Sequence, residues 1–218
     1  MKKQSIFLYA LTLFISASFG VASAQSSTST VVGPEFGIKG GVNMSNLYSD
    51  SDDINDENAL WGFNAGVFAA FPIADNVFIQ PEILYTTKGA ELDYDFAGIE
   101  GTSKFKLSYI EVPLLVRFNL TENFNIHVGG YASYLVSAKT KGEGDVEFED
   151  ELDADDFERF DAGLSAGVGV DFNPISIGLR YNYGLTTIGK ERTDAGVNYT
   201  FPDAKNSNLS LYLAYKLN

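Results

Sequence analysis

Apolar and polar side chains alternate without interruption between residues 160 and 172. Even positions carry Phe, Ala, Leu or Val, whereas odd positions carry Asp, Gly or Ser. A period of two indicates a β-strand whose two faces meet different surroundings. At about 3.4 Å per residue the segment is roughly 40 Å long, which is enough to cross a bilayer at a tilt. The pattern therefore predicts a membrane-spanning strand.

The same alternation recurs along the rest of the chain. It predicts eight strands, at residues 34–47, 60–71, 77–87, 104–118, 124–137, 159–172, 175–185 and 207–217. Tight connections at 72–76, 119–123 and 173–174 alternate with long ones at 48–59, 88–103, 138–158 and 186–206. Short turns at one rim and long loops at the other are typical of outer-membrane barrels. We therefore predict an all-β fold, an eight-stranded antiparallel up-and-down transmembrane β-barrel over residues 34–218, with both ends at the periplasmic rim.

Aromatic residues recur at both ends of the predicted outward faces. Near the tight connections these residues are Phe36, Phe71, Phe118, Phe124, Phe172 and Tyr215. Near the long connections they are Trp61, Tyr85, Tyr134, Phe160 and Tyr183. Two aromatic rings of consistent parity predict the girdles that a transmembrane barrel places at its two membrane interfaces.

A soluble lipocalin-like barrel is the structural alternative, since it would turn the apolar face inward. The interior of an eight-stranded barrel is narrow and only just filled by side chains. In this chain the small residues lie on the polar face, which carries Gly37, Gly66, Gly163 and Gly167 among others. Turning the apolar face inward on every strand would overfill the core, so the pattern favours the membrane barrel.

The predicted inward face also carries charges of both signs. The charged residues are Lys39, Glu82, Glu111, Arg117, Asp161, Asp171, Arg180 and Lys216, and Asn43, Asn64 and Gln80 accompany them. Buried charges are costly unless they pair. We therefore expect an ion-paired polar barrel interior and no open pore, although the pattern does not say which acid meets which base.

The amino-terminal segment has the features of an export signal. Lys2 and Lys3 precede an apolar run over 6–19, and Ala22-Ser23-Ala24 resembles a cleavage site. We predict a signal peptide at 1–24 and a flexible polar periplasmic lead-in at 25–33. An uncleaved anchor is the alternative, but the apolar run is short for a spanning helix. The chain has no Cys, which excludes disulfides and a lipid-anchored cysteine.

The net charge is −14, and most of the 29 acidic residues lie in the four long connections. Such a surface repels nucleic acid, which is excluded as a partner. The carboxylates could bind divalent cations, but solvated loops are the simpler interpretation. Neither 50–53 nor 153–156 continues into a calcium-loop motif.

One segment resembles a catalytic motif. Residues 163–167 read Gly-Leu-Ser-Ala-Gly, which matches the nucleophile elbow of hydrolases. The elbow needs a sharp turn, whereas here the strand alternation runs through it. His127 is the only histidine and is expected inside the barrel. We predict no catalytic residues, no cofactor and no metal ligands, and hence no enzyme.

Four segments of the predicted strands have a recognisable sequence. They are Gly37-Ile38-Lys39-Gly40-Gly41-Val42-Asn43, Ile79-Gln80-Pro81-Glu82-Ile83-Leu84-Tyr85, Tyr109-Ile110-Glu111-Val112-Pro113-Leu114-Leu115 and Gly178-Leu179-Arg180-Tyr181. Together these segments resemble the PorT-like outer membrane β-barrel family of Gram-negative bacteria. The resemblance implies an eight-stranded outer-membrane barrel. It implies little about activity, since most members have no assigned biochemical role, although PorT itself is linked to protein secretion and gliding machinery.

The leading functional hypothesis is a non-enzymatic outer-membrane protein with a structural or interaction role and acidic loops facing the exterior. The second is an accessory component of a protein secretion complex. A lipid-modifying membrane enzyme and a small-solute channel rank lower, because they need a catalytic cluster near one rim or interior space. The expected partners are outer-membrane lipids, with envelope or secretion proteins and loop-bound divalent cations as further candidates.

Overall fold

A computed structural model describes residues 33–49, 57–96, 99–144, 148–152, 158–188, 191–194, 197–200 and 204–218. Residues 33–218 form one compact unit. Its strands are β1 Glu35–Ser49, β2 Glu57–Ala74, β3 Val77–Phe96, β4 Ile99–Asn119, β5 Phe124–Gly144, β6 Phe148–Leu152, β7 Phe160–Phe172, β8 Ile175–Thr187, β9 Glu191–Asp194, β10 Val197–Thr200 and β11 Ala204–Lys216. The predicted signal peptide at 1–24 and most of the lead-in at 25–33 lie outside the described residues. No helix in the described part of the chain is long and apolar enough to cross a membrane.

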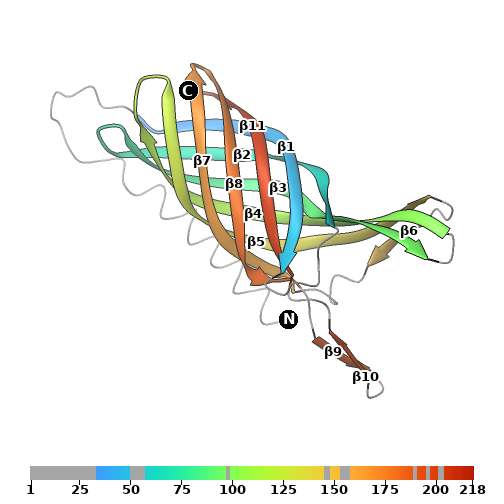
Figure 1. The fold of residues 1–218 in the computed structure, drawn as a ribbon. Coiled ribbons are helices and arrows are strands. Elements are labelled where there is room, and N and C mark those ends of the chain that lie inside the picture. Colours follow the sequence, from blue (N-terminus) through green and yellow to red (C-terminus); the bar gives the residue numbers. More distant parts are fainter. Residues whose placement is uncertain are drawn as a thin grey trace. The chain divides into compact units, whose positions relative to one another are not determined.

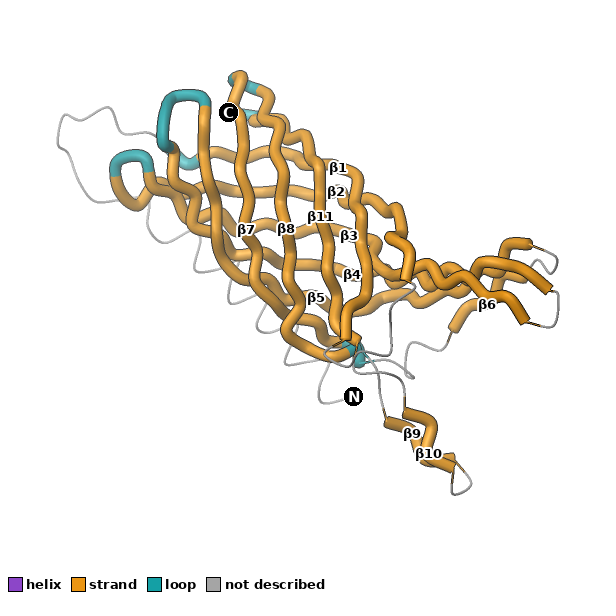
Figure 2. Tube along the Cα trace, in the orientation of Figure 1, coloured by secondary structure: helices purple, strands orange, loops and turns teal. Residues whose placement is uncertain are grey.

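Eight of these strands close into a barrel (Figures 1 and 2). The hydrogen-bonded order is β4-β3-β2-β1-β11-β8-β7-β5, and pairing of β4 with β5 closes the ring. All the pairings are antiparallel, and each barrel strand pairs with its neighbours along the chain. The predicted eight-stranded up-and-down β-barrel is therefore confirmed. Closure leaves no barrel edge, so every strand satisfies its backbone groups within the ring, as hydrocarbon requires.

The tight connections gather at one rim together with the start of β1 and the end of β11. The turn from β2 to β3 consists of Asp75 and Asn76, and Asn76 adopts a φ of 61°. Asparagine tolerates this left-handed conformation better than most residues. The N–H of Leu217 donates to the carbonyl of Phe36 over 2.8 Å, which joins the last residues to the first strand. The barrel domain thus begins and ends at the rim of short turns.

The predicted long connection at 88–103 is wrong in its main part. β3 and β4 stay paired as far as Phe96 opposite Ile99, so only residues 97–98 fall outside the described strands. β5 likewise continues to Gly144 and pairs with β6. These segments contain Gly, Asp, Glu and Lys, which are depleted in strands and conceal the pattern. These segments form strands because their backbones pair with the neighbouring strand, although their side chains do not alternate. β9 and β10 form a separate hairpin within the predicted connection at 186–206.

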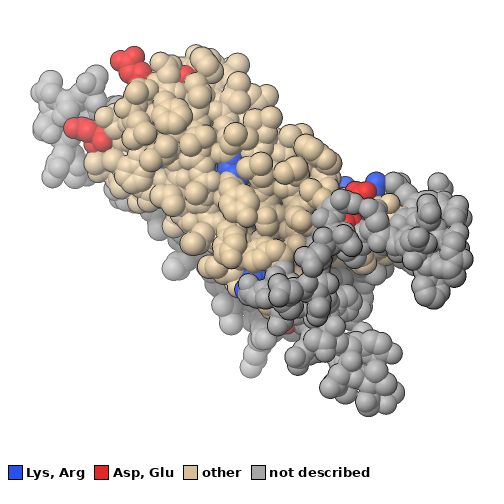
Figure 3. All heavy atoms as spheres, in the orientation of Figure 1, with Lys and Arg blue, Asp and Glu red and all other residues tan. Residues whose placement is uncertain are grey.

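The apolar face of the barrel points outward. Large apolar side chains are exposed along every barrel strand, with Trp61 at 69% and Leu211 at 49%, whereas charged residues such as Lys39, Glu82 and Arg180 of the same wall are buried. The side of the barrel in Figure 3 accordingly shows few charged atoms among the described residues. Exposed apolar surface is unfavourable in water by about 25 cal/mol per Å². An apolar outer surface around a charged interior fits a lipid environment and contradicts the lipocalin-like alternative.

Candidate functional site

Most of the buried charged and hydrogen-bonding side chains of the described residues lie in the barrel interior. Small residues on the inner face leave room for a few large ones. The ring of Tyr212 occupies the place where a Cβ on Gly178 would lie, and the ring of His127 occupies the same place at Gly167. Gly178 and Gly167 are therefore required, because a larger side chain at either position would collide with the ring that packs against it. Three ion clusters fill the space that remains.

The first cluster lies around Glu82 of β3, which is 1% exposed. Arg180 of β8 donates to both carboxylate oxygens of Glu82, over 2.7 and 2.8 Å. Lys39 of β1 lies 3.3 Å from the same carboxylate, and the side-chain amide of Gln80 donates to it over 2.7 Å. The bidentate geometry is the strongest arrangement for an arginine and a carboxylate. Arg180 also donates to Nε2 of His127 over 3.2 Å, so the imidazole belongs to this cluster.

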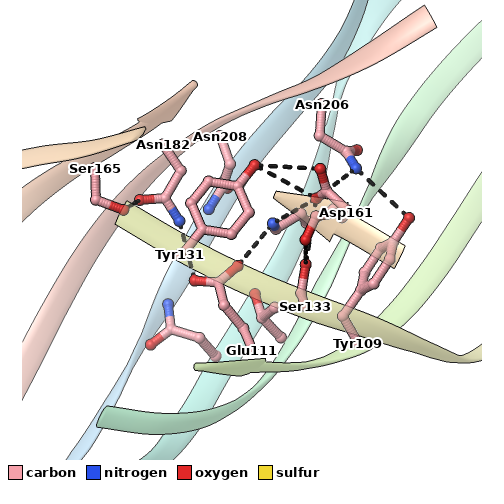
Figure 4. A network of polar contacts seen from close by, with 12 residues as sticks. Tyr109, Glu111, Tyr131, Ser133, Asp161, Ser165, Asn182, Asn206 and Asn208 are labelled. Atoms are coloured by element: carbon pink, nitrogen blue, oxygen red, sulfur yellow. Dashed lines mark hydrogen bonds and ion pairs between the residues drawn. The ribbon is translucent and has the colours of Figure 1, made fainter. Parts of the chain in front are cut away.

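The second cluster lies around Asp161 of β7 (Figure 4). Lys88 of β3 lies 3.2 Å from Asp161 and 2.7 Å from Glu111 of β4. The amide of Asn206 donates to Asp161 over 3.0 Å. Tyr131, Ser133 and Thr186 also donate to Asp161. One buried carboxylate therefore joins side chains from β3, β5, β8 and β11 across the interior.

The third cluster lies at the rim of short turns. Arg117 of β4 lies 2.9 Å from Glu35 of β1, and Lys216 of β11 lies 3.3 Å from the same carboxylate. Lys216 also lies 3.9 Å from Asp171 of β7, to which Asn125 donates over 2.9 Å. The three clusters together contain five cations and five carboxylates, so their formal charges balance. Paired and hydrogen-bonded charges can be kept away from bulk water, whereas isolated ones cannot.

Little free space remains between the clusters. Side chains that include Asn64 and Asn208 line a cavity of about 10 Å³, which has room for roughly one water molecule. At the opposite rim from the short turns, an apolar cluster covers the interior. It consists of Leu107, Tyr109, Leu135, Ala138 and Ile188, with Leu47 packed against it. Within the described residues, the interior is therefore a filled polar core beneath an apolar lid.

The predicted inward charges all lie inside the barrel. Lys39, Glu82, Glu111, Arg117, Asp161, Asp171 and Arg180 are buried, and the side chain of Lys216 is 12% exposed. Sequence reasoning missed Lys88, because it fell in a predicted loop, and Glu35, which lies at a strand start. It also missed Asn206 and Asn208, although their alternation with Leu209 and Leu211 was a readable signal.

The predicted girdle residues point away from the interior. The exposed ones are Phe36, Phe124, Phe172 and Tyr215 near the short turns and Trp61, Tyr85, Phe160 and Tyr183 near the far rim. Phe71, Phe118 and Tyr134 are partly buried. Cross-strand register aligns Tyr85, Ile110, Tyr134 and Phe160 in one outward row. Phe36 and Phe71 contact edge to face, with ring centroids 6.1 Å apart.

The two side chains that could take part in such catalysis, Ser165 and His127, are buried inside the barrel. Residues 163–167 belong to the uninterrupted strand β7, so no turn exposes Ser165. The Ser165 hydroxyl donates to Asn182 over 2.7 Å, while His127 contacts Arg180 and Asn125. Among the described residues, no group of three or more metal-ligating side chains is arranged around a common point. The acidic segments 50–53 and 153–156 lie outside the described residues.

The fold and the inverted polarity define the class of protein as a transmembrane β-barrel. Residues 23–189 match the family described as outer membrane protein beta-barrel domain, and the chain belongs to this family. The protein is therefore located in the outer membrane, as the sequence pattern predicts. No curated protein matches the chain.

Several solved outer-membrane barrels are similar to this chain at low sequence identity. Neisserial surface protein A is 15% identical, with 85% of this chain and 99% of that chain covered and a TM-score of 0.48. The attachment invasion locus protein Ail of Yersinia pestis is 17% identical, with 85% and 99% covered and a TM-score of 0.43. OprG from Pseudomonas aeruginosa is 16% identical, with 85% and 97% covered and a TM-score of 0.45.

Proposed function

We propose that this protein is a non-enzymatic, non-conducting outer-membrane scaffold with a structural or interaction role. The observation that carries the proposal is the filled interior, in which five cations and five carboxylates are paired beneath an apolar lid. A solute channel would need continuous space, and an eight-stranded barrel offers little. A catalytic site would need substrate access, which the interior Ser165 and His127 lack. What is left to contact partners is the outer surface and the segments beyond the barrel.

The orientation of the acidic segments is part of the proposal. In outer-membrane barrels the short turns face the periplasm and the longer connections face the exterior. By that rule β6 and the extensions of β3, β4 and β5 are external, as is most of the acidic sequence. The two sets of aromatic residues then lie at the two membrane interfaces, as girdles.

Planar-bilayer recording of the purified protein tests the closed interior. Wild-type protein is expected to give no stable large conductance, since no open path crosses the ion clusters. The matched comparison is a Leu107→Ser, Leu135→Ser variant, which weakens the apolar lid and leaves the ion clusters intact. It should also remain closed, because the clusters lie below the lid. A stable conductance from folded wild-type protein would refute the scaffold proposal.

An accessory role in a protein secretion complex is the alternative. It is supported by the resemblance of the segments around Lys39, Glu82, Glu111 and Arg180 to PorT-like proteins. Gentle detergent extraction from the native membrane distinguishes the two roles. Stoichiometric co-purification of envelope proteins would favour the secretion complex, whereas a clean single species would favour the stand-alone scaffold.

A further inference from the structure

A small cavity lies in the barrel interior between the first two ion clusters. Its volume is about 10 Å³, which is enough for one water molecule. Lys39 and Arg180 of the first cluster line it, as does Glu111 of the second cluster. The lining also includes two side-chain amides, those of Asn64 on β2 and Asn208 on β11. The cavity therefore brings together polar groups from opposite ends of the chain.

Two buried amide oxygens in the cavity lining accept no hydrogen bond from any of the described residues. They are Oδ1 of Asn64 and Oδ1 of Asn208, and these residues are only 5% and 2% exposed. Most buried polar atoms in proteins are paired, because a buried acceptor without a donor lowers stability. The cavity therefore offers two acceptors to a small molecule that can donate two hydrogen bonds.

The orientation of both amides follows from one backbone carbonyl. Nδ2 of Asn43 donates to the carbonyl of Thr87 over 3.1 Å, so Oδ1 of Asn43 is the acceptor end of that side chain. This oxygen lies 2.6 Å from Oγ of Ser210, and such a contact requires the hydroxyl hydrogen between the two atoms. Oγ of Ser210 then accepts from Nδ2 of Asn64 and from Nδ2 of Asn208, each over 3.3 Å. Reversing either amide would place two acceptor oxygens together, so the two Oδ1 atoms are the unpartnered ends.

The charges in the lining decide which kind of molecule fits. Lys39 and Arg180 would repel a cation, whereas Glu111 and the two amide oxygens would repel an anion. A neutral molecule of this size that both donates and accepts hydrogen bonds is water. Among the described residues, the guanidinium of Arg180 makes three hydrogen bonds, which is fewer than its N–H groups allow. It can therefore also donate to an oxygen in the cavity.

We propose that the cavity binds one internal water molecule, which donates to Oδ1 of Asn64 and to Oδ1 of Asn208 and accepts from Arg180. The water joins β2 to β11, two strands that β1 separates in the ring. It also lies beside Glu111, to which Asn182 donates over 3.0 Å (Figure 4). The polar contacts of the first ion cluster thereby continue into the second. Because the filled interior surrounds the water, it exchanges slowly with the solvent.

A crystal structure of the refolded full-length protein, at a resolution that shows ordered water, tests the site directly. Electron density is expected in the cavity at about 2.5–3.0 Å from both amide oxygens. Density near only one of the oxygens, or no density, would overturn the proposal. Sodium ions and water scatter X-rays alike, so a second crystal is soaked in a thallium(I) salt. An anomalous thallium peak in the cavity would identify a cation site and would also overturn the proposal.

Oxygen-17 magnetic relaxation dispersion, which counts long-lived internal water molecules, tests the site in detergent micelles. Asn208→Leu removes one of the two acceptors at similar volume and should lower the count by one, because the water loses a polar partner. Asn119→Leu is the matched control and should leave the count unchanged. It also removes an unpartnered amide oxygen, but at the half-buried end of β4, outside the cavity lining. A heat-dependent gel mobility shift verifies that each variant is folded. Equal counts in wild type and Asn208→Leu, or equal losses in the two variants, would overturn the proposal.

Discussion

Replacing Glu82 by Gln tests whether the interior is held by charge pairing. The substitution keeps the side-chain volume but removes the carboxylate that Arg180 and Lys39 share. Both cations are buried, and removal of one partner from a buried pair costs about 3–5 kcal/mol. The free energy of unfolding of the barrel should fall by about that amount.

Urea-induced unfolding from phospholipid vesicles measures this effect, with the fluorescence of Trp61 as the signal because the chain has a single tryptophan. Glu35→Gln is the matched control. Its side chain is 17% exposed at the rim, so water can partly replace its contacts and the loss should be about 1 kcal/mol. Combining Glu82→Gln with Arg180→Met should recover about 1–3 kcal/mol, because one of the two uncompensated cations is then absent. The reasoning fails if Glu82→Gln is no more destabilising than Glu35→Gln, or if the double variant is the less stable one.

Three further predictions address the walls of the barrel. Brominated lipids should quench Trp61 most strongly when the bromine lies near the headgroup, since the residue belongs to the predicted outer girdle; strongest quenching from the bilayer centre would contradict that position. Gly178→Leu should destabilise the barrel by about 1–3 kcal/mol in the same urea assay, because Tyr212 already fills the space beside it. Leu211→Arg should lower the free energy of unfolding by about 2–4 kcal/mol, whereas Leu120→Arg in the turn should lower it by at most about 1 kcal/mol. Equal losses would contradict the placement of Leu211 within the hydrocarbon and of Leu120 at the membrane surface.

The period-two pattern was sufficient to predict the architecture, because each face of a strand in a membrane barrel meets a distinct medium. Residues 160–172 show this most clearly, since every outward position is apolar and every inward position is small or polar. The tight turn at 173–174 matches the structure, and the turn from β2 to β3 is tight but consists of Asp75 and Asn76 alone. The pattern weakened beyond residue 87, where Gly, Asp, Glu and Lys interrupt the alternation. The continuation of β3 and β4 through 88–103 was missed for that reason.

Within the predicted strands, regular alternation alone determined which face carries the apolar residues and which the charged ones, because each strand repeats every two residues. Only the tertiary structure decided which acidic side chain pairs with which basic one. Glu82 and Arg180 are separated by 98 positions along the chain, and their bidentate contact depends on the register of strands that are not neighbours in the ring. The side-chain pattern and the turns set the register between adjacent strands, but a contact across the ring depends on the registers of all the strands between and on closure of the barrel.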